Sequence, residues 1–447
     1  MARGCGCADE GAVAAACARE AEDAAARLGR RFRRPEARAH AADYLRGLLA
    51  EVERKNGWQL AERVGYAHPR GIQRVLDRYA WDADAVRDDL RAYVVAEFGD
   101  PAGVLVVDET GFPKQGMRSA GVARQDCGTL GKRANCQVGV FLGYASPQGH
   151  AVLDRALYLP EAWTADRDRC RAAGIPDGVA FRTKPALAGE LVERALDAGV
   201  PAAWVVGDAV YGADSKFRSP LEERGQAYVL AVRSTQPIST WPPDGPPAQL
   251  TVADVAAAVP ARAWARLSCG DGAQGPRVYD WAYAPLRPAL RDEAWIHAAL
   301  VRRHPERPDE VAFSLVHCPA ATALAEVVRA AGARWTIDDA FKRAKGQVGL
   351  DQYEVRSWRG WHRHVTLALL ALAVLTVAAR RAGKGGRPRR APARSTSRSP
   401  SPRSAASSSA SSGPPPARPP PPPTPWPGPA GGAGTNGSRS GATSAAA

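Results

Sequence analysis

The amino-acid sequence predicts a mixed α/β fold that follows an α-helical region. From about Pro35 to Gly99, apolar residues recur every three or four positions, as on one face of an amphipathic helix. From Gly103 the pattern changes to short, continuous apolar runs, which are typical of strands buried on both faces. These runs alternate with helical patterns such as residues 184–199, so we expect a sheet covered by helices.

The order of elements follows from these patterns. The predicted core strands are residues 103–112, 135–146, 150–160, 202–210 and 227–232. The predicted helices of the core and of the C-terminal part are residues 184–199, 215–225, 321–332 and 334–345, and a closing apolar helix from about 359. Pro/Gly clusters and short strand-like pieces occupy residues 233–318, which predicts an inserted β-rich subdomain.

The net charge of +14 is concentrated at the C-terminal end. From Arg380 onward there are eleven basic residues and no acidic residue, whereas residues 1–379 carry 49 basic and 46 acidic residues. The charge of the body is nearly balanced, so composition alone gives little support for nucleic-acid binding. Residues 383–447 are rich in Arg, Pro, Ser, Ala and Gly and are predicted to be disordered.

Cysteine usage and hydropathy favour a cytoplasmic protein. The eight cysteines lack the spacing of a zinc site, which indicates reduced thiols. The N-terminus is charged and has no apolar segment of the signal-peptide kind. The longest apolar run, Val365 to Ala379, is 15 residues, which is short for a membrane span and fits a buried helix.

The N-terminal helical region contains a possible helix-turn-helix. The segments "GWQLAERVG" (57–65) and "HPRGIQRVLDRY" (68–79) have the pattern of two helices joined by a short turn. Docked on DNA, such a motif would use the polar residues Lys55, Asn56, Gln59, Arg70 and Arg74. A plain helical bundle with solvated charges explains the pattern equally well.

Two apolar strands each end in an aspartate. Asp108 follows "VLVV" and Asp208 follows "WVVG". Ligands collect at strand ends in open α/β sheets, and paired carboxylates there can bind a divalent metal such as Mg²⁺. The alternative is that these aspartates only cap helices or turns.

A third carboxylate lies in a predicted helix near the C-terminal end of the core. Arg334, Asp338 and Lys345 are spaced by four and seven residues and therefore share one face of the helix. Asp338 could complete a metal-binding cluster for phosphoryl transfer, with the two cations near phosphate. The three side chains could equally form a solvated salt-bridge ladder.

Three blocks of the sequence closely resemble bacterial insertion-sequence transposases of the DDE superfamily. They are "VVDETGFPKQGMRSAGVARQDCGTLGKRANCQVGVFLGYAS" (106–146), "WVVGDAVYG" (204–212) and "RWTIDDAFKRAKGQVGLDQYEVRSWRGWHRHVTLALLALAVL" (334–375). The resemblance spans roughly residues 34–380 and is to the group with a β-rich insertion before the third acidic residue. Its motifs are long and occur in the same order, so they are far more specific than a lone pair of acidic residues.

The resemblance implies an RNase-H-like catalytic core and a helical N-terminal DNA-binding domain. The implied reaction is cut-and-paste transposition that depends on Mg²⁺ or Mn²⁺, with two ions. A protein of this kind binds the terminal inverted repeats of its element, cleaves DNA and joins the 3′ ends to target DNA. It would act in the cytoplasm, on the nucleoid, as a homodimer in complex with DNA.

Matched by position, Asp108, Asp208 and Asp338 correspond to the three catalytic, metal-binding acids of these transposases. Arg334 and Lys345 correspond to the basic residues that flank the third acid, where the resemblance implies contact with DNA phosphate. Two further basic residues, in the loop "GFPKQGMRS", could bind the DNA backbone or could simply be solvated. They are Lys114 and Arg118.

The sequence departs from the family pattern at the third acid, which is normally glutamate. Asp338 is one methylene shorter, and a misplacement of ~1 Å can cost about a hundredfold in rate. Asp339 points about 100° away around the helix and is a poor substitute, and Glu354 is a more remote polar candidate. The alternative to an active transposase is therefore a catalytically degenerate, transposase-derived DNA-binding protein.

An aspartyl-phosphate phosphatase of the haloacid dehalogenase type is a third possibility, but such an enzyme needs an aspartate where this chain has Thr110. The tail is unlike that of the transposases, and we interpret it as either an out-of-frame segment or a disordered basic extension. The expected domains are a disordered Ala-rich N-terminus (1–33), a helical DNA-binding domain (34–100), the RNase-H-like core (101–232 and 319–382), the β-rich insertion (233–318) and the tail (383–447).

Overall fold

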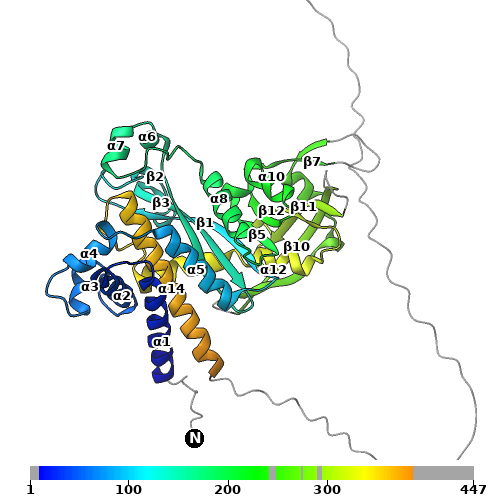
Figure 1. The fold of residues 1–447 in the computed structure, drawn as a ribbon. Coiled ribbons are helices and arrows are strands. Elements are labelled where there is room, and N and C mark those ends of the chain that lie inside the picture. Colours follow the sequence, from blue (N-terminus) through cyan, green and yellow to red (C-terminus); the bar gives the residue numbers. More distant parts are fainter. Residues whose placement is uncertain (1–9, 241–247, 273–274, 289–293, 386–447) are drawn as a thin grey trace, which may run out of the picture.

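A computed structural model of the chain describes residues 10–240, 248–272, 275–288 and 294–385 (Figure 1). At its centre is one large twisted sheet, with helices on both faces and a group of helices at one end. The predicted tail lies outside the described residues from residue 386 onward, so its two interpretations remain predictions.

Ten strands of the described residues form the main sheet. The core strands are β1 (Val104–Pro113), β2 (Ala123–Cys127), β3 (Lys132–Ser146), β4 (Gly149–Tyr158), β5 (Trp204–Gly207) and β6 (Ala227–Val232). The later strands are β9 (Ala265–Gly272), β10 (Gly275–Pro288), β11 (Trp295–Arg303) and β12 (Val311–Pro319). A separate hairpin consists of β7 (Pro237–Thr240) and β8 (Ala248–Thr251).

Strand β1 occupies the middle of the core. It pairs with β3 in antiparallel fashion on one side and with β5 in parallel fashion on the other, and β5 pairs in parallel with β6. Strand β4 pairs with β3 along the edge of β3 that faces away from β1. The residues from Val104 to Val107 are buried because helices cover both faces of the sheet at this point. This large mixed sheet with covering helices is consistent with the RNase-H-like core that the resemblance implied.

The predicted insertion is rich in strands, but most of it does not form a separate sheet. Strand β12 pairs with β6, and β11, β10 and β9 follow in order, all antiparallel to their neighbours. The interior of the core therefore continues into the insertion, where Ala298 to Val301 of β11 are buried. The residues predicted as a β-rich insertion thus do form strands, and backbone hydrogen bonds between β12 and β6 join these strands to the core sheet.

The helices were expected in most of their positions. The N-terminal helices are α1 (Glu10–Gly29), α2 (Pro35–Leu49), α3 (Gly57–Arg63), α4 (Arg70–Asp77) and α5 (Ala83–Phe98). The central helices are α6 (Glu161–Thr164), α7 (Arg167–Ala172), α8 (Lys184–Asp197), α9 (Ala209–Gly212), α10 (Ser215–Glu223) and α11 (Val252–Ala257). Helices α12 (Leu324–Gly332), α13 (Trp335–Val348) and α14 (Trp358–Gly385) follow, and short 3₁₀ turns occur at η1 (Gly128–Leu130) and η2 (Ala261–Ala263).

Helix α14 joins the N-terminal helices to the sheet. Arg363 donates hydrogen bonds to the carbonyl oxygens of Val75, Leu76 and Trp81, and the Tyr44 hydroxyl lies 2.8 Å from His364 Nδ1. The N-terminal helices and the sheet consequently share one continuous apolar core. α14 is long and apolar enough to cross a membrane, but 72% of its most apolar stretch is buried in the protein, as expected of a core helix.

The prediction of disorder over residues 1–33 is wrong for residues 10–33. Helix α1 packs against α14 and α2, and its side chains Ala21, Ala24 and Leu28 are buried. Glu20 on α1 is buried, where it accepts a 2.8 Å hydrogen bond from the Tyr93 hydroxyl and pairs with Arg381. The Ala-rich pattern of residues 1–30 is compatible with either a frayed helix or disorder, because alanine gives a weak apolar periodicity, and the structure has the helix. Residues 1–9 lie outside the described residues.

Candidate active site

Asp108 lies halfway along β1, in register with Phe141 of β3. Its side chain is partly buried, and Oδ1 accepts a 2.7 Å hydrogen bond from the Glu109 amide. Burial, followed by repulsion from Asp208, raises the pKa of Asp108 to about 7, and Asp338 adds to the rise. The three acids predicted from the sequence come from three separate segments. Asp208 and Asp338 each interact electrostatically with Asp108.

Asp208 directly follows β5, the parallel neighbour of β1. Its Oδ1 accepts a 2.9 Å hydrogen bond from the Val210 amide, so Asp208 caps the short helix α9. Burial and repulsion from Glu109 raise the pKa of Asp208, whereas Arg334 acts to lower it. The capping role considered for strand-end aspartates is thus real, and backbone N–H groups of both Val210 and Tyr211 act on the Asp208 carboxylate.

Asp338 is in the first turn of α13 and is exposed. The preceding residue, Ile337, is buried over Gly143 of β3, which anchors the start of α13 to the sheet beside β1. Asp339 points elsewhere, since its Oδ2 lies 3.3 Å from His150 Nε2. Asp338 is therefore the carboxylate of α13 that faces Asp108, and Glu354 is exposed on the loop before α14.

The donor chemistry of these residues fits a divalent cation. Within the described part of the chain, no group of three His, Cys, Asp or Glu side chains is close enough to surround a metal ion. Mg²⁺ needs only one or two protein carboxylates, because water and substrate phosphates supply its other ligands. Asp108 and Asp208 meet that requirement, and a cation between them would relieve the repulsion that raises the pKa of Asp108.

The two basic residues of α13 have different surroundings. Arg334 precedes the first turn of α13 and lies near enough to Asp208 to act on its pKa. Lys345 Nζ donates hydrogen bonds to Thr110 Oγ1 (2.8 Å), the Gly111 carbonyl (3.2 Å) and Thr129 Oγ1 (2.8 Å). All three donors of Lys345 are used within the protein, so this lysine ties α13 to the end of β1. The phosphate contact implied for Lys345 remains a prediction that would require these bonds to break.

The two basic residues of the loop after β1, Lys114 and Arg118, have different surroundings. The Lys114 ammonium lies 3.5 Å from the centre of the Tyr353 ring and 3.3 Å from the Tyr353 carbonyl oxygen. Burial lowers the pKa of Lys114 to about 8, and Asp351 and Glu354 oppose this shift. Arg118 is exposed. Lys114 therefore packs against an aromatic ring, and Arg118 is the residue of this loop that is open to a ligand.

A hydrogen-bond network around Glu109, which was not among the predicted site residues, holds α9 next to Asp208. Glu109 accepts a 2.6 Å hydrogen bond from Lys184 Nζ and a 2.5 Å hydrogen bond from the Tyr211 hydroxyl. Tyr211 belongs to α9, the helix that Asp208 caps, so Glu109 holds that helix against β1. Two features of the sequence could have pointed to this network. Glu109 directly follows Asp108, and Tyr211 lies in the same segment "GDAVYG" as Asp208. Strand alternation puts Glu109 on the sheet face opposite Asp108.

The proposed helix-turn-helix is present as helices α3 and α4, but three of its five candidate contacts are used internally. Lys55 is buried and bonds the Ala50 carbonyl, Asn56 caps α3, and Gln59 accepts from the Arg54 amide. The other two candidates, Arg70 and Arg74, are exposed on α4. If this motif binds DNA, α4 presents the basic side chains.

The carboxylates predict an unusual dependence of stability on pH. A carboxyl group whose pKa is raised by folding favours the folded state below its unfolded pKa near 3.8, and this contribution is lost as the pH rises through about 7. Asp108→Asn should therefore raise the melting temperature of the metal-free protein by about 2–4 °C at pH 8, corresponding to about 1–2 kcal/mol, and much less at pH 5.5.

Thermal unfolding with a chelator present, at both pH values, measures this effect. Asp126→Asn is a suitable control because Asp126 lies on β2 and is 87% exposed. An equal melting temperature for Asp108→Asn and the unaltered protein at pH 8 would show that neither burial nor the neighbouring acids penalise the ionised form of Asp108.

The fold and these acids define a candidate nuclease site where the parallel pairing of β1 and β5 ends; Asp208 follows the end of β5 as predicted, whereas β1 continues past Asp108 to Pro113. Comparison with known proteins agrees: the family model described as DDE superfamily endonuclease matches residues 27–263, more than half of the sequence. The chain belongs to this family. It is also 32% identical, over 204 residues, to a protein of Microchaete diplosiphon named "Probable transposase for insertion sequence element IS701". The match covers 44% of this chain and 49% of that relative, so this chain spans about half the length of the relative.

Proposed function

We propose that this protein is a DNA transposase that cleaves DNA at the ends of its insertion sequence and joins the 3′ ends to target DNA. The observation that carries this proposal is that Asp208 and Asp338 both act on the partly buried Asp108 carboxyl: burial is the largest cause of its raised pKa, and the two other acids add to the rise. Family membership and the similarity to a named insertion-sequence transposase support it. Acids that repel one another in the metal-free protein are suited to hold cations when DNA arrives.

In the proposed reaction, Asp108 and Asp208 hold Mg²⁺ or Mn²⁺, and Asp338 adds a ligand from α13. When bound, the divalent ions would supply activation of the attacking water or 3′ hydroxyl and stabilisation of the leaving oxygen. Arg334, beside Asp208, would contact the phosphate next to the bond that is cut. Glu109 and Tyr211 would keep Asp208 in place as the charge in the site changes.

The proposal includes the partners of the reaction. DNA would be bound both as terminal inverted repeats and as target, with the exposed arginines of α4 as candidate contacts. Two copies of the chain would act together on two DNA ends, as in related transposases. The site of action would be the cytoplasm, on the nucleoid.

Cleavage of the gene's own flanking DNA tests the proposal. Purified full-length protein would be incubated with labelled fragments that carry the flanking ends, with Mg²⁺, with Mn²⁺ or with a chelator. We expect metal-dependent cuts at the ends and none in a fragment with scrambled ends. Specific binding without cutting would instead identify a degenerate DNA-binding protein, and absence of specific binding would rule out both functions.

A further inference from the structure

Three arginines beside the candidate active site surround a single tryptophan. The guanidinium carbons of Arg277, Arg302 and Arg334 lie 4.3, 5.2 and 5.8 Å from the centre of the Trp335 ring. Arg302 also lies 4.5 Å from the ring of Tyr279, which stacks on Trp335. Within the described residues, none of the three arginines forms an ion pair with a carboxylate. We call these three residues the arginine cluster.

The strand register places the arginine cluster at the same end of the sheet as the carboxylates. Reading across the sheet, Val107 pairs with Gly207, Gly207 with Leu230, Leu230 with Leu315, and Leu315 with Ala299. Strands β1 and β11 run in the same direction. Asp108 is one residue beyond this row and Arg302 is three residues beyond it. Asp108 therefore lies just beyond the point where the parallel pairing of β1 with β5 ends, and Arg302 lies near the carboxyl end of β11.

The same register gives the approximate distance between the two sites. Strands β1 and β11 are four places apart in the sheet, which corresponds to about 19 Å at the usual strand spacing. Arg334 lies between the two sites, because it is close enough to Asp208 to act on its pKa and also belongs to the arginine cluster. A DNA strand that passes from Asp108 to Arg302 would cover about five or six base steps at 3.4 Å each.

The positive charges of the arginine cluster repel one another and have no ion-paired carboxylate among the described residues. Burial lowers the pKa of Arg302, and the positive charges of Arg334 and Arg277 act in the same direction. Arg277 donates a 3.4 Å hydrogen bond to the Gly332 carbonyl and also interacts with the Cys269 thiol, while its Nε is buried without a partner. An arginine normally reaches bidentate acceptors such as phosphate, and an anion here would offset the mutual repulsion.

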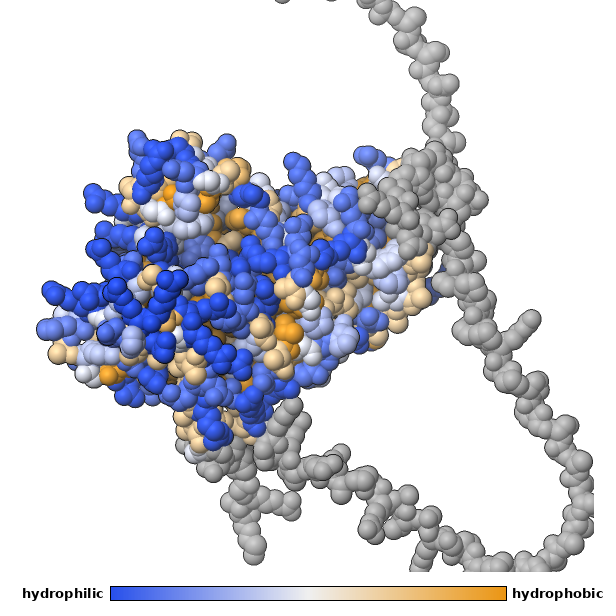
Figure 2. Space-filling view, in the orientation of Figure 1, coloured by the Kyte–Doolittle hydropathy of each residue, from blue (hydrophilic) through white to orange (hydrophobic). Residues whose placement is uncertain are grey.

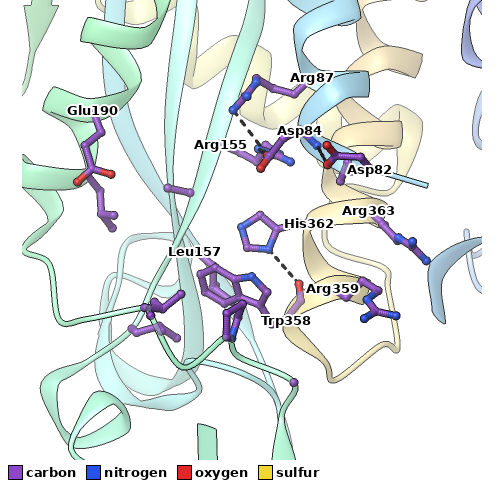
Figure 3. A pocket seen from close by; sticks show the side chains of 18 of the residues that line it. Asp82, Asp84, Arg87, Arg155, Leu157, Glu190, Trp358, Arg359, His362 and Arg363 are labelled. Atoms are coloured by element: carbon purple, nitrogen blue, oxygen red, sulfur yellow. Dashed lines mark hydrogen bonds and ion pairs between the residues drawn. The ribbon is translucent and has the colours of Figure 1, made fainter. Parts of the chain in front are cut away.

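Several other arginines next to the main sheet have acidic partners. In a cavity of about 530 Å³ at the outer edge of β4, Asp84 lies 2.9 Å from Arg155 and 3.7 Å from Arg87 (Figure 3). The same holds for Arg303, the neighbour of Arg302 on β11. It points to the other face, 3.5 Å from Asp280. The arginine cluster differs from both because its charge is not neutralised by the described protein.

We propose that Arg277 and Arg302, contributed by strands of the insertion, bind backbone phosphates of the DNA end that enters the active site, about five or six base steps from the bond that is cut. Arg334 links this contact to the carboxylates. The inference rests on the proposed function, since it requires DNA at Asp108. It gives the insertion a direct role in holding the substrate, at positions that the sequence comparison did not single out.

The salt dependence of DNA binding tests the proposal. Each phosphate contact contributes about 0.9 to the slope of log affinity against log salt concentration. For a fragment that carries the element end, we expect the double variant Arg277→Gln/Arg302→Gln to lower the slope by about 1–2 and to weaken binding at least about tenfold. Arg303→Gln should leave both unchanged, and Arg302→Lys should retain most of the slope.

Phosphate ethylation interference locates the contact. In the unaltered protein, ethylation about five or six nucleotides from the cut should block binding, and this interference should disappear in the double variant. Circular dichroism confirms that each variant is folded. The proposal is overturned if the folded double variant keeps the slope of the Arg303→Gln control, or if the loss appears only with DNA lacking the ends. If the unaltered protein fails to bind end DNA, both this inference and the proposed function are overturned.

Discussion

Asp208→Ala is expected to lower metal-dependent DNA cleavage by at least about a thousandfold while DNA binding is retained. Asp208 is one of the two partly buried carboxylates suited to hold a cation, and metal-based stabilisation of the reacting charges is worth several kcal/mol. Its other role, capping α9 through the Val210 amide, concerns only a four-residue helix that Glu109 also holds through Tyr211. The variant should therefore fold, and its defect should lie in the chemical step.

Asp214 provides a matched control for this variant. It also caps a short helix, α10, by accepting a 2.8 Å hydrogen bond from the Lys216 amide. Asp214→Ala should lower stability by about 1 kcal/mol and leave the cleavage rate nearly unchanged. The two variants separate loss of a helix cap from loss of a metal ligand under single-turnover conditions with saturating DNA. Equal cleavage rates for both would contradict the assignment of Asp208.

The parts of the site that follow from local pattern could be predicted from the sequence. Asp108 and Asp208 end apolar runs, and the carboxyl ends of parallel strands meet at one edge of a sheet. The helical periodicity of residues 334–345 likewise placed Asp338 and Asp339 in different directions, and the contact of Asp339 with His150 agrees with this. In each case the relevant geometry depends on neighbours in sequence.

The features that were missed depend on contacts between distant segments. Nothing in the sequence pairs β12 with β6, so an insertion that extends the core sheet is indistinguishable from one that folds alone. The three acceptors of Lys345 come from β1 and η1, more than two hundred residues away. The arginine cluster is equally non-local, because Arg277, Arg302 and Arg334 come from two strands and a helix start. Charge counts alone gave no reason to single it out.

The surface composition of the molecule does not mark a DNA-binding face either. Figure 2 shows hydrophilic side chains over most of the visible face of the described residues, with only small apolar areas between them. The body carries nearly equal numbers of acidic and basic residues, so its net charge does not mark a DNA-binding face. What distinguishes one arginine from another is its partner: Arg303 has Asp280, whereas Arg302 has aromatic rings.

Asp338→Glu is expected to raise the cleavage rate, by up to about a hundredfold. Asp338 is exposed in the first turn of α13. Buried Ile337 fixes the start of α13 to the sheet, so the helix backbone cannot easily move closer to the site to compensate for a short side chain. One added methylene moves the carboxylate towards Asp108, and a ~1 Å error in placement costs about that factor. Because Asp338 is exposed, the longer side chain fits without displacing core residues.

Asp338→Ala and Asp339→Glu complete this experiment. Asp338→Ala should reduce cleavage further, because it removes the third carboxylate, whereas Asp339→Glu should have little effect since that residue faces His150. The rates of all four proteins would be compared at saturating Mg²⁺ and again at saturating Mn²⁺, with the end-bearing DNA fragment in excess. A rate for Asp338→Glu at or below that of Asp338→Ala would show that α13 holds the carboxylate at the required distance only when it is short. In that case aspartate at this position is an adaptation of the site, and the structural fit of α13 to β1 and β3 sets the length of the third acid.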